Sequence, residues 1–334
     1  MKNKKIRIGI IGAGQNTRKI HLPKFLALPD VEVREVANRT IQSAKNSAEE
    51  FHIPTIRESW EEVATSPDLD AIVIGTWPYL HCPATCLALE SGKHVLCEAR
   101  MAMNQSEARR MLDISRKHPN LVAQLVPAPF SLHADHLMAE MIRRGDLGKI
   151  LFFHVDYQSA PLTVPQKVLH WRRNKIFSGM NIMTLVIIYE SLLRWLPPAQ
   201  WVKAEAQIFN DTAIAPETGE TVKIEIPDYL SAQMSLQEGI SGTFLISETG
   251  SHAGKPKVKI FGQRGTLVLK FVPKGKLYFG RRDQAQLEEV PIPQSLRGIW
   301  KVEESIMAKE TKKGKHEEAN IIFIHKNSGI KVQW

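Results

Sequence analysis

Short apolar runs alternate with helix-like segments along the first part of the chain. The runs resemble strands at residues 7–11, 31–37, 70–76, 94–98 and 121–126. Between them, residues 41–51, 83–90 and 104–118 carry apolar positions at helical spacing, and Ser59 and Asn104 are suited to cap helix starts. Short connections between alternating strands and helices are typical of a parallel sheet, so we predict a doubly wound α/β domain over residues 1–124.

The second part of the chain has a different pattern. A helix predicted over residues 134–144 precedes a long strand at 149–158, and a helical apolar block follows at 180–196. Apolar and polar residues then alternate with a period of two at 201–209, 229–237, 240–247, 257–261 and 266–271. This alternation predicts an α+β domain over residues 125–334, with an open, largely antiparallel sheet covered on one face. A length of 334 residues suits two domains, each with its own core.

A Gly-Ala-Gly turn directly follows the first apolar strand and precedes a helical pattern. This order lets backbone amides approach a pyrophosphate at a helix N-terminus, where partial positive charge favours an anion. The alternative is a glycine-rich turn in another kind of α/β protein, because Gly-x-Gly alone is a weak signal. Together with the strand and the helix, the turn predicts dinucleotide binding by Gly12, Ala13, Gly14, Gln15 and Asn16.

Asn38 and Arg39 stand at the end of the second strand, where a dinucleotide fingerprint expects an acid for the ribose. An amide and a guanidinium present no carboxylate to repel a 2′-phosphate, and Arg39 offers that phosphate a partner. We therefore expect NADP or NAD as the cofactor and favour NADP.

Composition and charge argue against several classes of partner. With 24% charged and 43% apolar residues, the chain has the composition of a globular protein. Its net charge is +9, but the lysines and arginines are interspersed with acidic residues over most of the chain. The densest basic run, at residues 309–315, lacks interleaved aromatic residues, so we expect no nucleic-acid partner. We expect no membrane span either, because no apolar stretch reaches about 18 residues. The cysteines Cys82, Cys86 and Cys97 suit a reducing compartment and core packing, so we predict a cytoplasmic protein without a metal site.

Further motifs follow in a fixed order. They are Gly-Lys-His-Val-Leu-Cys-Glu at residues 92–98, Gly-Asp-Leu-Gly-Lys at 145–149, and shorter ones at 171–172, 193–195, 226–229 and 262–267. With the Gly-Ala-Gly turn, this order resembles the Gfo/Idh/MocA family of nicotinamide-dependent oxidoreductases over roughly residues 5–310. The resemblance implies a Rossmann domain, a C-terminal α/β domain with an open sheet, and bound NAD or NADP. It also implies homo-oligomers, dimers or tetramers, formed through that sheet, and sugars, polyols or related hydroxy compounds as substrates.

The resemblance also implies where the cofactor lies. Asn38 and Arg39 are expected at the adenosine ribose. The residues expected on the nicotinamide side follow two strands of the first sheet and are Thr76, Trp77, Pro78, His81, Glu98 and Ala99. We expect His81 to position neighbouring groups rather than to transfer a proton.

Several family positions carry other residues in this chain. The lysine that the family places beside the nicotinamide is Ala99, and the family's acid and histidine on the first long helix of the second domain correspond to Thr184 and Ile188. The third fingerprint glycine is Thr17, and the tail after Trp300 is shorter than the family's closing helix and strand. Because Ala99, Thr184 and Ile188 do not titrate near neutral pH, the usual proton-transfer groups are missing.

Five residues are candidates for the missing chemistry: Arg100, His170, Arg172, Tyr189 and its neighbour Glu190. Arg100 stays charged, so it suits stabilisation of an oxyanion better than proton transfer. His170 is either a catalytic base or an ordinary loop histidine. For Tyr189 we favour packing of a helix face beneath the sheet over catalysis, since one helical position rotates it about 100° away from Ile188.

Three functions stay open at this point. The leading one is an NAD(P)-dependent oxidoreductase that acts by hydride transfer on a sugar, polyol or related small hydroxy or oxo compound. The second is a regulatory protein that binds the dinucleotide without turnover. The third is a lyase or hydrolase that uses transient oxidation.

Overall fold

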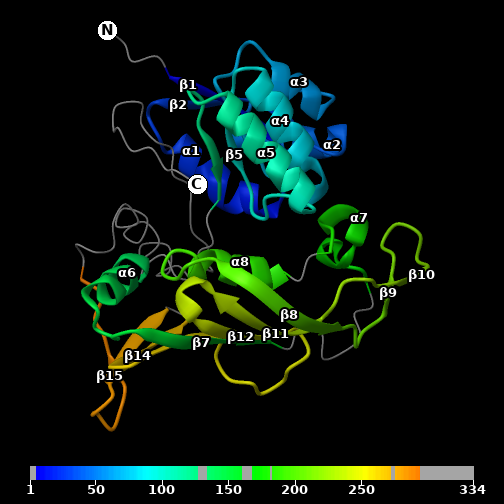
Figure 1. Ribbon diagram of the computed structural model, residues 1–334. Coiled ribbons are helices and arrows are strands. Elements are labelled where there is room, and N and C mark those ends of the chain that lie inside the picture. Colours follow the sequence, from blue (N-terminus) through cyan, green and yellow to red (C-terminus); the bar gives the residue numbers. More distant parts are fainter. Residues whose placement is uncertain (1–4, 127–133, 160–167, 181–182, 272–274, 294–334) are drawn as a thin grey trace. The chain divides into compact units, whose positions relative to one another are not determined.

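The computed structural model describes residues 5–126, 134–159, 168–180, 183–271 and 275–293 (Figure 1). These residues form two compact units, the first within residues 5–126 and the second within residues 134–293. Each unit has its own sheet and its own core.

The first unit is built on a six-stranded parallel sheet in the order β3-β2-β1-β4-β5-β6. The strands are β1 (Ile6–Ile11), β2 (Val31–Ala37), β3 (Thr55–Ile56), β4 (Ala71–Ile74), β5 (His94–Cys97) and β6 (Ala123–Leu125). The direction of strand addition reverses between β1 and β4, and open α/β sheets bind ligands at the carboxyl ends of the strands beside such a reversal. The predicted doubly wound parallel sheet is confirmed.

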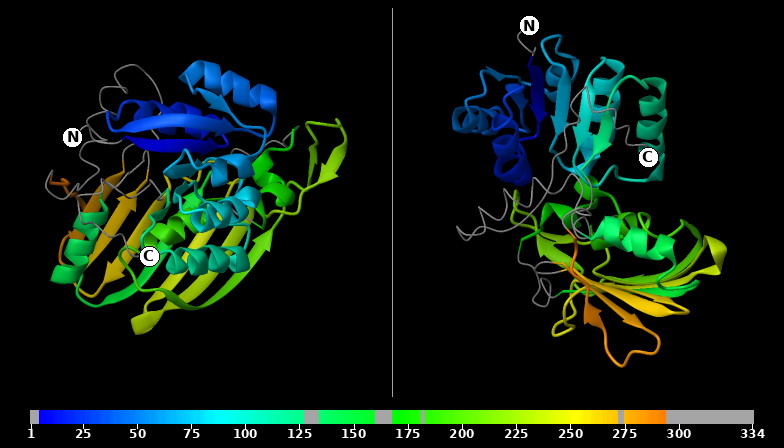
Figure 2. Two further views of the ribbon diagram at one scale, coloured as in Figure 1. Left: turned by 90° about the horizontal axis from the view of Figure 1, so that it is seen from above. Right: turned by 90° about the vertical axis from the view of Figure 1, so that its left-hand side faces the viewer.

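Helices cover both faces of this sheet (Figure 2, right). The cores place α1 (Leu22–Leu26) and α2 (Ile41–Phe51) on one face, and α3 (Trp60–Thr65), α4 (His81–Glu90) and α5 (Gln105–Lys117) on the other. The two predicted caps form: the Ser59 hydroxyl accepts from the Glu62 amide, and the Asn104 side-chain oxygen accepts from the Glu107 amide. The caps mark where α3 and α5 begin, and therefore where the loops that follow β3 and β5 at the carboxyl edge of the sheet end.

The second unit contains an eight-stranded sheet in the order β16-β15-β14-β13-β7-β12-β11-β8. Its strands are β7 (Ile150–Gln158), β8 (Ala199–Gln207), β11 (Tyr229–Leu236), β12 (Ser241–Ser247), β13 (Lys257–Gly262), β14 (Gly265–Lys270), β15 (Lys276–Arg281) and β16 (Glu288–Glu289). The β7–β12 pair is parallel and the other described pairs of this sheet are antiparallel, which confirms the predicted sheet type. A separate hairpin joins β9 (Thr212–Ile214) and β10 (Thr221–Lys223).

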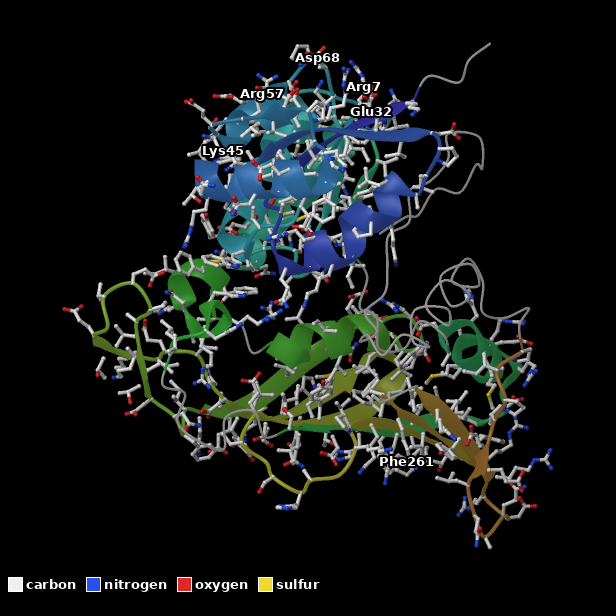
Figure 3. All side chains as sticks on the ribbon, turned by 180° about the vertical axis from the view of Figure 1, so that it is seen from behind. Arg7, Glu32, Lys45, Arg57, Asp68 and Phe261 are labelled. Carbon is white, nitrogen blue, oxygen red and sulfur yellow. The ribbon has the colours of Figure 1, made fainter. Side chains whose placement is uncertain are left out.

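One face of the second sheet is covered by helices. The helices α6 (Asp135–Arg144) and α8 (Met183–Leu192) lie on the same side of the sheet (Figure 1) and share a core with Phe153 and Val155 of β7. On the opposite face, Phe152 stacks on Phe261 with ring centroids 4.4 Å apart. Figure 3 shows Phe261 on the side of the sheet away from α8. The second sheet therefore has the covered face and the open face that the alternation predicts.

Some elements of the second unit differ from the predictions. The helical block expected over residues 180–196 forms α8 over the shorter range Met183–Leu192. The strands β9, β10 and β16 were not predicted, because segments of three, three and two residues show no periodicity. The strand β15 was not predicted because Leu277, Tyr278 and Phe279 break the alternation. The short tail after Trp300 lies outside the described residues.

Candidate active site

The Gly-Ala-Gly turn connects β1 to a helical segment in which residues Thr17–His21 have π-type hydrogen bonding. Gly12 has a φ of +86°, which favours glycine, and a Cβ there would lie 2.5 Å from the Thr76 side chain. A Cβ on Gly14 would meet nothing nearer than the Gly75 carbonyl oxygen at 3.4 Å. The turn is thus open beside Gly14, and this allows the close backbone approach that a pyrophosphate requires.

Thr17 stands where the fingerprint has its third glycine. Its hydroxyl donates to the Gly12 carbonyl oxygen at 3.2 Å. A Cβ on Gly75 would lie 2.0 Å from the same hydroxyl, so the Thr17 side chain fills the space that Gly75 leaves. Close packing of helix and sheet is therefore provided by a glycine after β4 instead of a glycine in the helix.

Asn38 holds the turn through its side-chain amide. Its Oδ1 accepts from the Ala13 amide at 2.6 Å, while its Nδ2 donates to the hydroxyls of Ser43 at 3.0 Å and Ser47 at 3.3 Å. Both ends of the amide are therefore engaged within the protein. The sequence places Asn38 at the end of β2 but gives no sign of these contacts, which join the turn to α2.

Arg39 is exposed, and its guanidinium carbon lies 5.2 Å from the centroid of the Trp77 ring. Trp77 follows β4, which is separated from β2 by β1 in the sheet. From the resemblance we expect Trp77 on the nicotinamide side and Arg39 on the adenosine side. The structure brings these two residues together.

Glu98 directly follows β5 and accepts three hydrogen bonds. Asn16 Nδ2 and His21 Nε2 bond to its Oε1, and the Ala99 amide donates to its Oε2 at 3.1 Å. Burial alone would raise the pKa of Glu98, but the bonds from His21, Asn16 and Ala99 outweigh burial and lower the pKa below its ordinary value. Glu98 is therefore a carboxylate at neutral pH.

His21 was not among the expected site residues, although the structure buries it completely against Glu98. Its Nδ1 is also buried and has no hydrogen-bond partner among the described residues. The signal that could have indicated it is a polar ring within the apolar helix face of Leu22 and Phe25. Because His21 bonds to the same oxygen as Asn16, it restricts how the Glu98 carboxylate can turn.

His81 begins α4 and bridges the loops that follow β4 and β5. Its Nδ1 lies 2.6 Å from the Arg100 carbonyl oxygen, and its Nε2 lies 3.0 Å from the Thr76 carbonyl oxygen. Burial lowers the pKa of His81, whereas the hydrogen bonds to these two carbonyls raise it, and the effect of burial prevails. Both ring nitrogens thus contact backbone, which suits positioning of the two loops.

In the second unit, His170 and Arg172 flank Trp171. The Trp171 ring lies 5.7 Å from the His170 ring, and the Arg172 guanidinium lies 4.5 Å from the Trp171 centroid. The His170 Nδ1 accepts from the Arg172 amide at 3.3 Å. Partial burial, and then the nearby charge of Arg172, lower the pKa of His170, so its imidazole is neutral at pH 7.

The next residue, Arg173, anchors this segment. Its guanidinium lies 3.4 Å from the Asp228 carboxylate and donates to the carbonyl oxygens of Asn210 at 3.1 Å and Ile226 at 3.2 Å. The two charged side chains are 6% and 0% exposed. Arg173 was not among the expected residues. Only burial distinguishes it from Arg172, and burial cannot be read from two adjacent arginines in the sequence. The short helix α7 (Lys175–Ser178) follows the anchor directly.

Tyr189 is held by packing on α8. Its hydroxyl accepts from the Ala199 amide at 3.0 Å, which ties α8 to the start of β8. The preceding residue, Ile188, is fully buried in the core of the second unit. The side chain of Thr184 lies outside the described residues.

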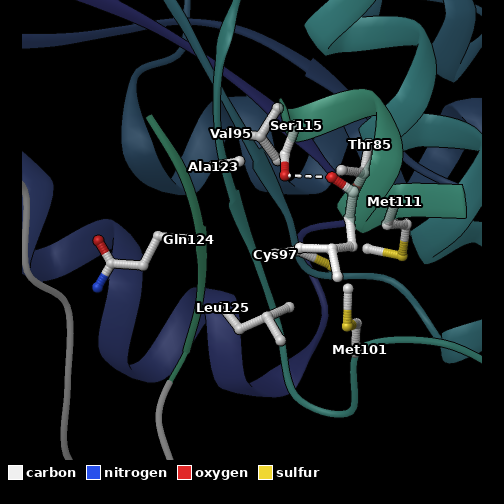
Figure 4. Close-up of a pocket in the computed structure, with 10 residues that line it drawn as sticks. Thr85, Val95, Cys97, Met101, Met111, Ser115, Ala123, Gln124 and Leu125 are labelled. Atoms are coloured by element: carbon white, nitrogen blue, oxygen red, sulfur yellow. Dashed lines mark hydrogen bonds between the residues drawn. The ribbon is translucent and has the colours of Figure 1, made fainter. Parts of the chain in front are cut away.

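A small cavity lies among α4, α5, β5 and β6 (Figure 4). Its lining is mainly apolar and includes Cys97, Met101 and Met111. Its volume of about 20 Å³ corresponds to about one water molecule, so this cavity is a packing gap and holds no sugar or dinucleotide.

The described part of the chain lacks the features of a metal centre and of a membrane span. There, no three His, Cys, Asp or Glu side chains are grouped so that they could hold a metal ion. The helices described are also too short or too polar to cross a membrane.

Both units match domains of one family. Residues 6–125 match the oxidoreductase family with an NAD-binding Rossmann fold, and residues 136–268 match the Gfo/Idh/MocA C-terminal domain. The chain belongs to the Gfo/Idh/MocA family.

Among the relatives of this Gfo/Idh/MocA protein is a trans-1,2-dihydrobenzene-1,2-diol dehydrogenase of Xenopus laevis, 30% identical over 139 residues. The alignment covers 42% of this chain and 42% of the frog enzyme, so the chain spans less than half of that relative. A levoglucosan dehydrogenase of Pseudarthrobacter phenanthrenivorans is 28% identical over 186 residues, which are 53% of this chain and 47% of that enzyme.

Solved structures share the fold over a longer span. A levoglucosan dehydrogenase in complex with NADH has a TM-score of 0.76 at 20% identity, with 89% of this chain and 83% of that chain covered. A 3-ketoreductase of Actinomadura kijaniata in complex with NADP and TDP-benzene has a TM-score of 0.68 at 21% identity, with 94% and 92% covered. At these identities the likeness establishes the fold of both Gfo/Idh/MocA domains.

Proposed function

We propose that this chain is an NADP-preferring oxidoreductase that acts on a sugar, polyol or related small hydroxy or oxo compound. Membership of the Gfo/Idh/MocA family supports the reaction class. The names of the relatives, which include a levoglucosan dehydrogenase and a D-glucoside 3-dehydrogenase, support the substrate class. Neighbours in fold were solved with NADH and with NADP, so the choice between the two has to come from this chain's own residues.

The end of β2 carries the argument for NADP. The side chain there is the Asn38 amide, which bonds to the Ala13 amide and the Ser43 hydroxyl, so no carboxylate faces an incoming phosphate at this position. Arg39 adds a positive charge to the same loop. A guanidinium binds a phosphate through charge-assisted bonds, which NAD cannot form because it lacks the 2′-phosphate.

Calorimetry with each oxidised cofactor tests this choice. We expect NADP to bind at least as tightly as NAD, and Arg39→Ala to weaken NADP alone. A bond to a charged group contributes about 1.5–3 kcal/mol, so the loss should be roughly 10-fold to 150-fold. Arg34→Ala, which removes the same charge from the middle of β2, is the matched control. Preference for NAD in the wild type, or an equal loss for both cofactors in Arg39→Ala, contradicts the proposal.

Other residues are proposed to bind the cofactor or to take part in proton transfer. Gly12, Ala13 and Gly14 would hold the pyrophosphate, and Glu98 and Thr76 would lie on the nicotinamide side. The nicotinamide supplies the hydride acceptor or donor when it is bound. In this proposal His170 is the candidate base for the hydroxyl proton, since its lowered pKa keeps the imidazole neutral. Arg172, beside it, is the candidate cation for negative charge on the substrate oxygen, and Arg100 of the first unit is an alternative candidate for that role.

A second candidate function is a dinucleotide-binding protein with little or no turnover. It is favoured by Ala99, which has no ammonium at the family's lysine position, and by Ile188, which is buried in an apolar core. General acid–base catalysis typically contributes about 10²–10⁴-fold, so its loss would leave binding intact and turnover weak.

A panel of sugars, polyols and small hydroxy compounds, followed by nicotinamide absorbance, distinguishes the two candidates. Slow turnover in the wild type, with little rescue by Ala99→Lys, favours the binding protein, because Thr184 and Ile188 still lack the partner acid and histidine. A normal turnover rate in the wild type that is lost in His170→Ala, with cofactor binding retained, rules out the binding protein. His136→Ala, which removes an exposed imidazole from α6, controls for the loss of an imidazole.

A further inference from the structure

Arg39 and Trp77 form a contact that crosses the carboxyl end of β1. Arg39 follows β2 and Trp77 follows β4, and the sheet order places β1 between these two strands. The guanidinium carbon lies 5.2 Å from the ring centroid, within the distance at which a cation is attracted to an aromatic face. The Gly-Ala-Gly turn begins directly after β1. The contact therefore lies at the edge of the sheet where the pyrophosphate is proposed to bind.

The contact limits the movement of a side chain that is otherwise exposed. Arg39 has several rotatable bonds, and an exposed arginine loses considerable rotamer entropy when it binds a ligand. In the described part of the chain, Arg39 forms no ion pair with a carboxylate. The Trp77 ring is thus the contact that the structure assigns to the guanidinium.

Stacking leaves the binding capacity of the guanidinium intact. A guanidinium uses its flat face on an aromatic ring, whereas its N–H donors point outward in the plane of the group. The same side chain can therefore stack on Trp77 and donate to two phosphate oxygens at once. Asn38 cannot replace it, because both ends of its amide are occupied.

We propose that Trp77 is a specificity-determining positioning residue that holds Arg39 ready for the 2′-phosphate of NADP. The inference rests on the proposed preference for NADP and adds a second residue to it. Trp77 acts through Arg39 and not on the phosphate itself. This role differs from a nicotinamide contact, and also from a platform for the adenine ring, because NAD would benefit equally from either of those.

A double-mutant cycle on the full chain tests the role of Trp77. Calorimetry measures the affinities of NADP and NAD for the wild type, Trp77→Ala, Trp77→Phe, Arg39→Ala and the double variant. A cation–aromatic contact at an exposed site corresponds to about a twofold to fivefold change in affinity. We expect Trp77→Ala to lose that factor for NADP and nothing for NAD, and Trp77→Phe to retain part of it. In the Arg39→Ala background, Trp77→Ala should have no further effect.

NAD affinity reports whether each variant is folded, and Tyr79→Ala, an exposed aromatic residue of the same loop, is the matched control. Equal losses for NAD and NADP in Trp77→Ala would identify a base platform or a nicotinamide contact and overturn the inference. Unchanged NADP affinity in Trp77→Ala, or a loss of NADP affinity that persists in the Arg39→Ala background, overturns the inference as well.

If the wild type prefers NAD, or binds neither cofactor, the proposed function fails first and the inference fails with it. If Arg39→Ala is selective but Trp77→Ala is not, the proposed function stands and the inference alone is wrong.

Discussion

At the scale of single residues, Glu98 combines burial with full hydrogen bonding. Its carboxylate has one oxygen bonded by Asn16 and His21 and the other by the Ala99 amide. Desolvation and these bonds act in opposite directions on its pKa, and the bonds prevail. Its charged form is therefore stabilised by folding, and this links the stability of the first unit to pH.

We expect Glu98→Gln to lower the free energy of unfolding of the first unit at pH 7 by about 1–3 kcal/mol. The pKa of Glu98 is lower in the folded than in the unfolded chain, so its contribution is present above pH about 4.3 and is lost as the pH falls through the folded value. Thermal melts at pH 7, 5 and 3.5 should show the difference from wild type shrinking at the lowest pH. The exposed Glu90→Gln serves as control. A difference that stays constant with pH would mean that Glu98 is not the titrating group.

The three cysteines provide a second measurement at this scale. Burial raises the pKa of Cys82 to about 12, and it also raises the pKa values of Cys86 and Cys97. Since the thiolate is the reactive form, we expect all three thiols to resist a disulfide reagent at pH 8 until denaturant is added. Absorbance of the released thiolate follows the reaction. A thiol that reacts within seconds in the folded protein would contradict this burial.

Residue positions were easier to predict than residue partners. The sequence placed Asn38 at the end of β2 correctly, because strand periodicity determines where β2 ends. It could not indicate the bond from Ala13 to Asn38, which depends on how closely the turn approaches β2. His21 was missed for a related reason, since its partner Glu98 lies 77 positions away in the chain.

At the scale of elements, one buried ion pair holds the segment that carries His170. Arg173 and Asp228 are almost completely buried, and Asp228 also accepts from the amides of Phe209 and Asn210. Burial alone would raise the pKa of Asp228, but these bonds outweigh it and lower the pKa. The pair joins residues 170–174 to the start of β11, so the position of His170 depends on it.

We expect Asp228→Ala to reduce stability by about 3–5 kcal/mol, because it leaves the Arg173 charge buried without a counter-charge. Lys175→Ala breaks the exposed pair with Glu225 nearby and should cost at most about 1 kcal/mol. Denaturant titration by circular dichroism compares the two variants. Equal effects would show that the Arg173–Asp228 pair is not a structural anchor.

Elements with a long periodic pattern were predicted well in both units. Helix α2 has the predicted bounds, Ile41–Phe51, because its apolar positions and Thr40 cap are local features. The hairpin β9–β10 and the strand β16 were not predicted, since their strands are too short for a pattern and exist through pairing. Local signals thus determine the long elements, while pairing determines the short ones.

At the scale of the whole molecule, the open face of the second sheet carries a row of aligned residues. Strand register places Trp201, Ser235, Ser241, Phe152 and Phe261 side by side across five strands, β8, β11, β12, β7 and β13. Trp201 is 55% exposed and Phe152 is 44% exposed. Exposed apolar residues in such a row favour an interface.

We predict that this face forms a homo-oligomer, most simply a twofold dimer. Light scattering at micromolar concentration should give a mass of at least twice 37.7 kDa. Phe152→Glu should shift that mass toward the monomer, whereas Ile176→Glu, which is exposed on α7, should not. A wild-type monomer would contradict the prediction.

The order of strands in the second sheet was beyond sequence reasoning. The alternation indicated an antiparallel sheet, but nothing local to β7 indicates that it lies between β12 and β13. The order depends on contacts between distant segments, such as Phe153 of β7, which packs edge-on against Phe244 of β12 with centroids 5.8 Å apart.

The central place of β7 affects how the chain folds during its synthesis. The six strands of the first sheet have all been made once Leu125 is added, so this unit can fold while the rest is still being translated. The strand β7 ends at Gln158, but its neighbours Ser241–Ser247 and Lys257–Gly262 emerge roughly 100 residues later. At about 5–20 residues per second, β7 stays unpaired for about 5–20 s. During that interval Phe152 and Phe153 are without their native cover, so this strand exposes apolar side chains of the kind that chaperones bind.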